Sequence, residues 1–263
     1  MTNGSYKKTD IVFSEPALPV LSARLMAIAQ MVQIGTHRVI DVGTDHAYLP
    51  IWLVANNISE QAIASDLRSG PAERAAANIH KYGLDQSIIV KTGDGITGID
   101  LDQSDTVIIA GMGGLEIQKI LNSDLPDGMN LLLQPQRSLE ELRYWLCTVR
   151  KWQIIDEEIV HDRGHFYVIM NVRTRHTTAS SSGEICCPAL NLIECWLGPI
   201  LIRKYANFEL CDASARDLWI SYLEDREKTL NKAVRGNADL SQVLIQIETI
   251  LHDAREFRKR GDA

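Results

Sequence analysis

Short apolar runs alternate with amphipathic stretches from residue 21 to residue 172. Each run is rich in Ile, Val and Leu and stops at a polar or Gly-containing segment, which predicts a buried strand. Predicted strands cover residues 38–42, 61–66, 87–91, 105–110, 130–133, 152–160 and 165–172, and predicted helices cover 21–32, 48–56, 71–82, 115–121 and 138–150. This order predicts an α/β fold with a mostly parallel seven-stranded sheet and helices on both faces. The hairpin through Asp162-Arg163-Gly164 requires one antiparallel strand.

The pattern changes after residue 172. A polar linker covers residues 173–188, and apolar residues then return at helical spacing over 189–206, 213–235 and 238–258. The last stretch has an apolar stripe, and a turn at Gly236-Asn237 predicts an antiparallel helix pair. The stripe consists of Leu240, Leu244, Ile247, Leu251 and Ala254. We therefore expect an α/β domain at residues 1–176 and a small all-helical domain at residues 189–263.

Composition narrows the class of protein. Of the 263 residues, 45% are hydrophobic and 23% are charged, which is ordinary for a globular chain. No run approaches the roughly 20 apolar residues of a membrane span, and no apolar core follows Lys7-Lys8 as it would in a signal peptide. We therefore expect a cytoplasmic location and no membrane partner. A monomeric state is also expected.

The cysteines argue against a metal site, and the net charge argues against generic binding to nucleic acid. The five cysteines contain no C-x-x-C pair, and adjacent Cys186-Cys187 has no second pair at ligand spacing. No metal site is therefore expected. The formal charge of −7 argues against generic binding to nucleic acid, but it leaves room for a local basic face.

The loop after the first predicted strand reads DVGTDH (residues 41–46) and carries the candidate chemistry. A dinucleotide site needs three glycines to close on a pyrophosphate, and this loop has only Gly43. Its acids, Asp41 and Asp45, repel phosphate but suit an ammonium group and ribose hydroxyls. S-adenosylmethionine has these groups and no phosphate. The structural alternative is a turn whose acids only cap the next helix.

Later strand ends add polar or Gly-rich loops in sequential order. Asp66 suits ribose hydroxyls, and Asp94 in the GDG segment (residues 93–95) suits an adenine amino group. The AGMGG segment (residues 110–114) brings backbone close to a ligand or a neighbouring helix, and Gln134 offers an amide that can bind a base edge. Each loop alone could be a cap or a tight turn. Together they indicate a nucleoside-containing ligand.

These motifs resemble those of the TrmK family, bacterial methyltransferases that form N1-methyladenosine at adenosine-22 of tRNA. The resemblance covers about residues 13–173 and rests on LSARL (residues 21–25), DVGTDHAYLP (41–50), GDG (93–95), AGMGG (110–114) and LQP (133–135). It implies a class I Rossmann-like methyltransferase domain and a coiled-coil-like C-terminal domain. Gln136 stands where Asn is more usual, and the tail matches loosely, through LGP (197–199) and YLEDRE (222–227).

The motifs and the resemblance together assign roles to residues. Donor binding is expected from Asp41, Gly43, Asp45, His46, Asp66, Asp94, Gly95, Gly111 and Met112. Asp45, Tyr48 and Gly113 are the catalytic candidates, with Asp45 or backbone carbonyls of residues 111–113 stabilising charge on the methylated base and Tyr48 stacking on it. Contacts with tRNA are expected from Tyr48, Gln134, Arg24, Arg137 and Arg143, and in the tail from Arg203, Lys204, Arg226, Lys228, Lys232 and Arg235.

Two other functions fit the same residues. One is a class I methyltransferase acting on a protein or a small molecule, which needs no basic face. The other is a non-catalytic nucleoside-binding module that acts through its helical tail. A nicotinamide-dependent dehydrogenase does not fit, because the glycines of a diphosphate site are missing.

Overall fold

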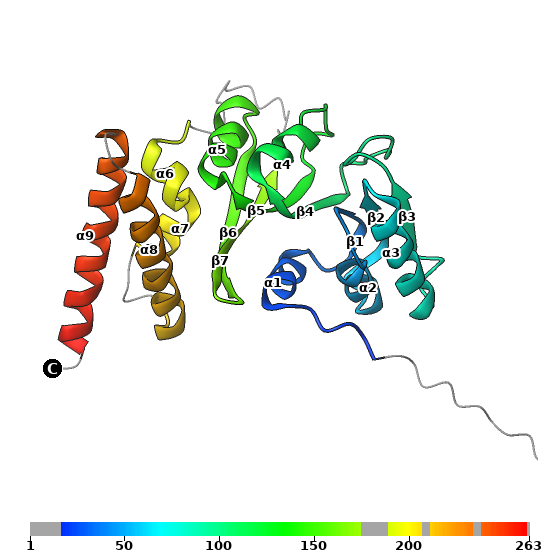
Figure 1. The fold of residues 1–263 in the computed structure, drawn as a ribbon, viewed down its shortest axis with the longest axis horizontal. Coiled ribbons are helices and arrows are strands. Elements are labelled where there is room, and N and C mark those ends of the chain that lie inside the picture. Colours follow the sequence, from blue (N-terminus) through cyan, green and yellow to red (C-terminus); the bar gives the residue numbers. More distant parts are fainter. Residues whose placement is uncertain (1–16, 175–188, 207–210, 234–237, 262–263) are drawn as a thin grey trace, which may run out of the picture.

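The computed structural model describes residues 17–174, 189–206, 211–233 and 238–261. Seven strands form one sheet in the order β3-β2-β1-β4-β5-β7-β6 (Figure 1). They are β1 (Thr36–Val42), β2 (Ser59–Asp66), β3 (Ile88–Thr92), β4 (Thr106–Gly113), β5 (Asn130–Arg137), β6 (Gln153–Asp162) and β7 (His165–Arg173). All neighbouring pairs are parallel except those of β7, which is antiparallel to both β5 and β6. The predicted fold class and the single antiparallel strand are confirmed.

Helices cover both faces of the sheet because alternate strand residues point to opposite sides. On one face Val39, Ile108 and Leu132 pack against α1 (Ala23–Met31), α2 (Tyr48–Ala55) and α3 (Ser69–Lys81). On the other, Ile40 and Ile109 pack against α4 (Gly114–Ile120), α5 (Leu139–Tyr144) and the π-turn at Trp145–Val149. The continuous apolar runs of the sequence are therefore buried on both faces.

Two predicted strands continue past their predicted ends. We expected β4 to stop at Ala110 and β5 at Leu133, with the Gly-rich and QPQ segments as loops. Instead the strands pair through Met112↔Pro135 and Gly113↔Arg137, with register shifts on either side of Met112. The irregularity is possible because Gly111 adopts a φ of +81°. The glycines therefore belong to a bulged strand end and not to a free loop.

A side-chain cap starts α1 but not α5. The Ser22 side chain accepts a hydrogen bond from the Leu25 amide and starts α1. Ser138 precedes α5 with a φ of +55°, and its side chain makes no such bond. The helix expected over residues 138–150 is also interrupted, because the π-turn replaces its second half.

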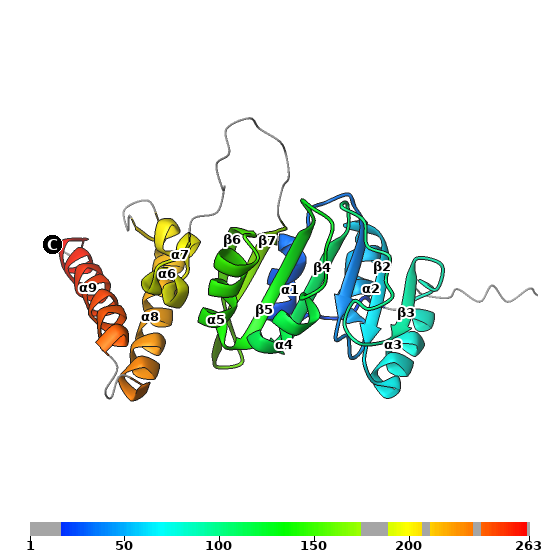
Figure 2. The ribbon, with the colours of Figure 1, turned by 90° about the horizontal axis from the view of Figure 1, so that it is seen from above.

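The C-terminal helices extend the molecule beyond the β6 edge of the sheet, with α9 outermost (Figure 2). They are α6 (Leu192–Leu197), α7 (Pro199–Lys204), α8 (Ala213–Ala233) and α9 (Ala238–Gly261). The single helix expected over 189–206 is wrong, because Gly198 takes a φ of +96° and Pro199 begins a new helix. Ile247, Leu251 and Ala254 of the predicted stripe are buried in the same apolar core as β6.

Several sequence-based expectations fall outside the described residues. These are the linker at 175–188 with Cys186-Cys187, the turn at Gly236-Asn237, and Arg235. Within the described helices, none is long and apolar enough to cross a membrane.

Candidate functional site

Ser65 ties together the ends of three parallel strands. Its carbonyl accepts hydrogen bonds from the amides of Gly43 at 2.8 Å and Thr44 at 3.0 Å. Its hydroxyl donates to the Gly95 carbonyl at 3.2 Å. The amides that would cradle a phosphate are thus bound to protein, which agrees with the absence of a diphosphate motif. Sequence analysis missed Ser65, although a polar residue next to Asp66 in an apolar strand was a signal.

A cavity of about 180 Å³ opens above the end of β1. Asp41 lines it and is buried, and burial raises the pKa of its carboxyl group to about 6. A hydrogen bond from Thr44 and the positive charge of Arg24 both lower this pKa, but by less than burial raises it. A buried carboxylate in an open cavity favours a cationic ligand, because such a ligand stabilises the ionised form.

Arg24 belongs to this cavity, although we predicted it as an RNA contact. Its Nη1 donates to Oε1 of Gln134 at 2.6 Å, and the same oxygen accepts from the Gly111 amide at 3.1 Å. Gln134 also donates to the Pro135 carbonyl and is wholly buried. Gln134 therefore holds Arg24 and the β4 bulge in place, and its predicted contact with a base edge is wrong.

Met112 stands over Gly43. The Met112 Cε occupies the space that a side chain at Gly43 would need, and Gly43 itself has a φ of +82°. The positive φ favours glycine at this position, and any larger residue would also push the end of the Met112 side chain aside. Ala110 lines the smaller cavity, and Gly113 lines a second, larger one, so Met112 lies between the two.

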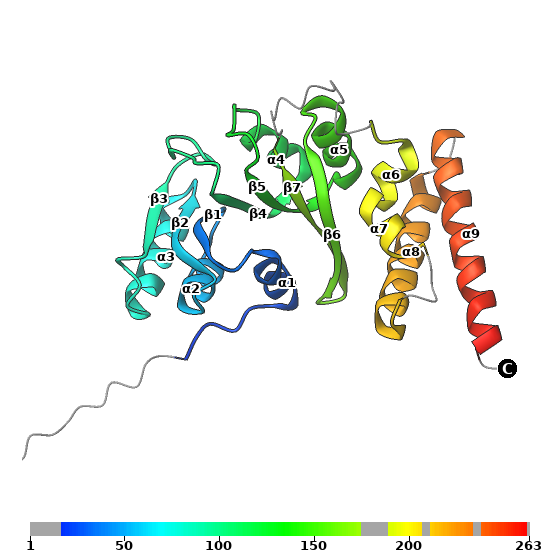
Figure 3. The same ribbon diagram turned by 180° about the vertical axis from the view of Figure 1, so that it is seen from behind.

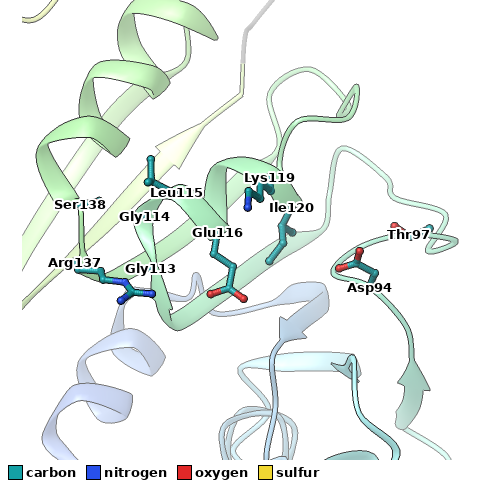
Figure 4. A pocket seen from close by; sticks show the side chains of 10 residues that line it. All are labelled: Asp94, Thr97, Gly113, Gly114, Leu115, Glu116, Lys119, Ile120, Arg137 and Ser138. Atoms are coloured by element: carbon teal, nitrogen blue, oxygen red, sulfur yellow. The ribbon is translucent and has the colours of Figure 1, made fainter.

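The second cavity, of about 540 Å³, lies between α4, the end of β5 and the loop after β3. Figure 4 shows the side chains of Arg137 and Glu116 on one side of this cavity, with Asp94 and Thr97 on the facing loop. Arg137 is exposed, and its Nε would lie 3.0 Å from a Cβ at Gly113. Asp94, Gly113 and Arg137 are thus brought to one cavity.

Asp45 lies at the outer rim of the small cavity. Its Oδ1 accepts from Arg74 Nη2 at 2.5 Å, and its Oδ2 lies 3.3 Å from His46 Nε2. The bond from Arg74 lowers the pKa of the Asp45 carboxyl group. Asn78, one turn after Arg74 on α3, donates to the His46 carbonyl at 3.0 Å. Sequence analysis missed both α3 residues, although their spacing of four places them on one helix face.

His46 and Tyr48 form an exposed aromatic stack. Their ring centroids lie 5.1 Å apart with an interplanar angle of 13°. Tyr48 is 38% exposed and lines the small cavity. An exposed ring that is held by a second ring is suited to stacking on a base.

Comparison with known proteins decides the family. A family model described as a methyltransferase domain matches residues 21–170. The tRNA (adenine(22)-N(1))-methyltransferase of Bacillus subtilis (strain 168) is 35% identical over 166 residues, which cover 62% of this chain and 69% of that protein. The chain belongs to the TrmK family.

Solved structures support this assignment over nearly the whole chain. The structure of Streptococcus pneumoniae Sp1610 in complex with S-adenosyl-L-methionine has a TM-score of 0.70 and 28% identity, and covers 89% of this chain and 100% of that one. The structure of M. capricolum TrmK in complex with S-adenosyl-homocysteine has a TM-score of 0.63 and 25% identity, and covers 90% of this chain and 97% of that one. The helical region thus belongs to the shared architecture.

In this TrmK protein a second buried acid lies at the end of β2, the strand next to β1. Asp66 is 6% exposed, and its Oδ1 accepts from the Arg68 amide at 2.9 Å. The Arg68 guanidinium approaches the same oxygen at 3.6 Å. A carboxylate with one oxygen engaged has a second to offer to ligand hydroxyls.

One predicted tRNA contact of this TrmK protein is wrong. Arg143 is wholly buried, and its Nε donates to Glu157 Oε1 at 2.8 Å. It therefore cannot touch a tRNA phosphate. In the tail, Lys204 and Arg226 pair with acids, while Lys228 and Lys232 are exposed. Among the described residues no group of three or more His, Cys, Asp or Glu is placed to hold a metal ion.

Proposed function

We propose that this protein transfers a methyl group from S-adenosylmethionine to N1 of adenosine-22 in tRNA. The observation that carries the proposal is the edge formed by Asp41, Ser65 and Asp66, in a chain of the TrmK family. Two buried carboxylates lie at neighbouring strand ends, and the loop amides are bound to Ser65. This edge fits a cationic, phosphate-free nucleoside.

The residues of the small cavity fit the amino-acid part of the donor. Asp41 binds the ammonium group, because an ionised partner offsets the cost of burying its carboxylate. Arg24 binds the carboxylate, since apart from His46 the other charged residues that line this cavity are acids. We therefore move Arg24 from the tRNA-binding set to the donor-binding set. His46 holds the rim of the cavity.

The nucleoside part of the donor fits the neighbouring strand ends. Asp66 accepts hydrogen bonds from the ribose hydroxyls, and Asp94 accepts from the adenine amino group. Gly95, Gly111 and Met112 shape the backbone and the wall of this channel. The donor supplies a methyl group on a positively charged sulfur and leaves as a neutral thioether.

The acceptor nitrogen needs no general base. N1 of adenine has a lone pair in the ring plane, so the protein has only to position it and stabilise the positive charge that adenine gains. Asp45 supplies a carboxylate at the rim, held by Arg74. The Gly113 carbonyl offers a second oxygen beside the large cavity, and Tyr48 stacks on the base, which must be turned out of the folded tRNA.

Exposed cations complete the tRNA surface. Arg137 stands at the mouth of the large cavity, and Lys228 with Lys232 lies on α8. Such cations bind phosphates through charge and counterion release. The cytoplasmic location expected from the sequence is part of the proposal, because tRNA is the substrate.

The experiment is labelled-methyl transfer to two transcripts of one tRNA, one with adenosine and one with guanosine at position 22. We expect label only in the first, and a block to primer extension at that nucleotide, since a methyl on N1 occupies the Watson–Crick edge. Nuclease digestion and mass spectrometry then identify N1-methyladenosine. Equal labelling of both transcripts, or label only in protein, would overturn the proposal.

A further inference from the structure

Arg143 and Glu157 form an ion pair that lies away from both cavities. Both side chains are wholly buried, and Arg143 Nε donates to Glu157 Oε1 at 2.8 Å. Arg143 Nη2 lies 2.8 Å from the same oxygen without a hydrogen bond, so this second contact is electrostatic. A buried pair contributes little net stability, since desolvation offsets the attraction. The other hydrogen bonds of the two side chains connect them to α6 and α7.

The pair joins the end of α6 to the start of α7. Arg143 Nη1 donates to the carbonyls of Cys195 at 2.9 Å and Trp196 at 3.1 Å, in the last turn of α6. Glu157 Oε2 accepts from the Ile200 amide at 2.9 Å, in the first turn of α7. A cation thus meets the negative end of one helix and an anion meets the positive end of the next.

Gly198 lies between these helices and touches both charges. A Cβ there would lie 2.6 Å from Glu157 Oε2 and 2.7 Å from Arg143 Nη2. Its φ of +96° is also unfavourable for other residues. The angle between α6 and α7 is therefore set by the ion pair and by the lack of a side chain at this position.

Lys204 fastens α7 to the outer edge of the sheet. Its Nζ donates to the Glu157 carbonyl at 2.6 Å and lies 2.7 Å from Asp156 Oδ1 and 3.1 Å from Glu158 Oε2. Because β6 is an edge strand, its outward carbonyls need a partner. Tyr222 of α8 also lies beside the Arg143 guanidinium.

The same strand leads from these contacts to the donor cavity. Five residues after Glu157, Asp162 ends β6 and accepts from the Arg24 amide at 3.4 Å. Figure 3 shows α1, which carries Arg24, beside the β6–β7 hairpin. Strand β6 thus contacts Arg24 at one end and the C-terminal helices further back along the strand.

We infer that Arg143, Glu157, Gly198 and Lys204, here called the β6 junction, are positioning residues for tRNA. The β6 junction holds α7–α9 at one fixed placement relative to the methyl-transfer edge. An RNA that contacts the C-terminal helices and the methyl-transfer edge at once must have a shape that fits the distance between them. The β6 junction therefore favours a folded tRNA over an unfolded strand. This inference rests on the proposed function, because it takes tRNA as the substrate.

The test compares wild type with Gly198→Ala and Lys204→Met. Gly83→Ala is the matched control, because Gly83 also has positive φ at a helix end but has open space around it. We expect KM for tRNA to rise about tenfold in both junction variants, with kcat and the Kd for S-adenosylhomocysteine within about twofold of wild type. Hydrogen exchange should become faster in the C-terminal helices α6–α9 and stay unchanged in the helices that pack on the sheet.

Two results would overturn the inference. One is faster exchange in α6–α9 with an unchanged KM for tRNA. The other is an equal loss of donor binding and kcat, which would indicate a general structural role. Lys204→Met leaves the buried pair intact, so it answers the question if Gly198→Ala fails to fold. Failure of the proposed function itself appears separately, as no N1-methyladenosine made by wild type.

Discussion

Arg24 Nη1 lies 2.6 Å from Gln134 Oε1, in a bond that fixes α1 to the end of β5. The guanidinium also lies 5.6 Å from the centre of the Tyr167 ring. Because the Gln134 amide oxygen and the Tyr167 ring both hold the guanidinium, it keeps a defined direction toward the Asp41 cavity. This placement makes the role of Arg24 testable apart from catalysis.

Arg24→Gln should weaken binding of S-adenosylhomocysteine by about tenfold or more, because the variant leaves the ligand carboxylate without a cation. Its binding of the decarboxylated analogue should match wild type. Calorimetry with both ligands measures the difference. An equal loss for the two ligands would contradict a contact with the carboxylate and would indicate distortion of the cavity.

Asp41 should make donor binding depend on pH. Its pKa of about 6 means that the free protein carries a proton on this carboxyl group below pH 6. Binding of the ammonium group requires the ionised form, so the Kd for S-adenosylhomocysteine should rise up to about tenfold for each pH unit below 6 and be constant above it. Titrations between pH 5 and pH 8 by calorimetry would measure this.

Asp41→Asn is the control for this profile, because it removes the titrating carboxyl group and keeps a side chain of similar size. The variant should bind more weakly at neutral pH and show no dependence on pH. The raised pKa also means that ionisation lowers the stability of the free protein as the pH rises through 6. Asp41→Asn should therefore unfold at a higher temperature than wild type at pH 7.5. A persistent pH dependence in the variant would assign it to another group.

Gly43→Ala should weaken donor binding, because the Met112 methyl group must move out of the space that the new Cβ takes. Gly35→Ala is the matched control: its φ of +84° is close to the +82° of Gly43, but no atom lies within 4 Å of its Cβ. Both variants should lose about 1–2 kcal/mol of stability from the left-handed backbone. Only Gly43→Ala should lose affinity in calorimetry, and similar affinities for the two would contradict the role of the Met112 contact.

Asp45→Asn should lower kcat for tRNA methylation by about a hundredfold, because the amide cannot stabilise the charge that the adenine gains. Its Kd for S-adenosylhomocysteine should stay within about tenfold of wild type, since Asp45 lies at the rim of the cavity and is exposed. Single-turnover methylation and calorimetry measure the two effects. Near-normal turnover would leave the Gly113 carbonyl as the stabilising group.

Lys228→Gln combined with Lys232→Gln should weaken tRNA binding and reduce the slope of log Kd against log salt by about one to two. Lys81→Gln is the control, because Lys81 is an exposed lysine on α3 at the opposite end of the sheet. Filter binding between about 50 and 200 mM salt measures the slope. An unchanged slope would remove α8 from the tRNA surface.

The apolar pattern was sufficient to predict the sheet, its antiparallel strand and the helical tail. Burial on both faces makes a strand a continuous apolar run, and this signal is local. The same holds for the phosphate-free strand edge, since Gly43 and its neighbouring acids are read directly from the chain. Family membership, too, was visible in contiguous motifs.

The tertiary structure decided which charged residues face a ligand. Arg143 and Glu157 are 14 residues apart, and in the sequence each occupies a polar position of an amphipathic pattern, which predicts a surface residue. In the structure the two side chains are buried together. Arg24 and Gln134 are 110 residues apart, and only the packing of α1 against the β4 and β5 ends directs Arg24 into the small cavity. The sequence by itself determined the fold and the chemical class of the ligand, because these depend on local composition and spacing. The direction and partners of long side chains depend on contacts between distant segments, which only the folded chain brings together.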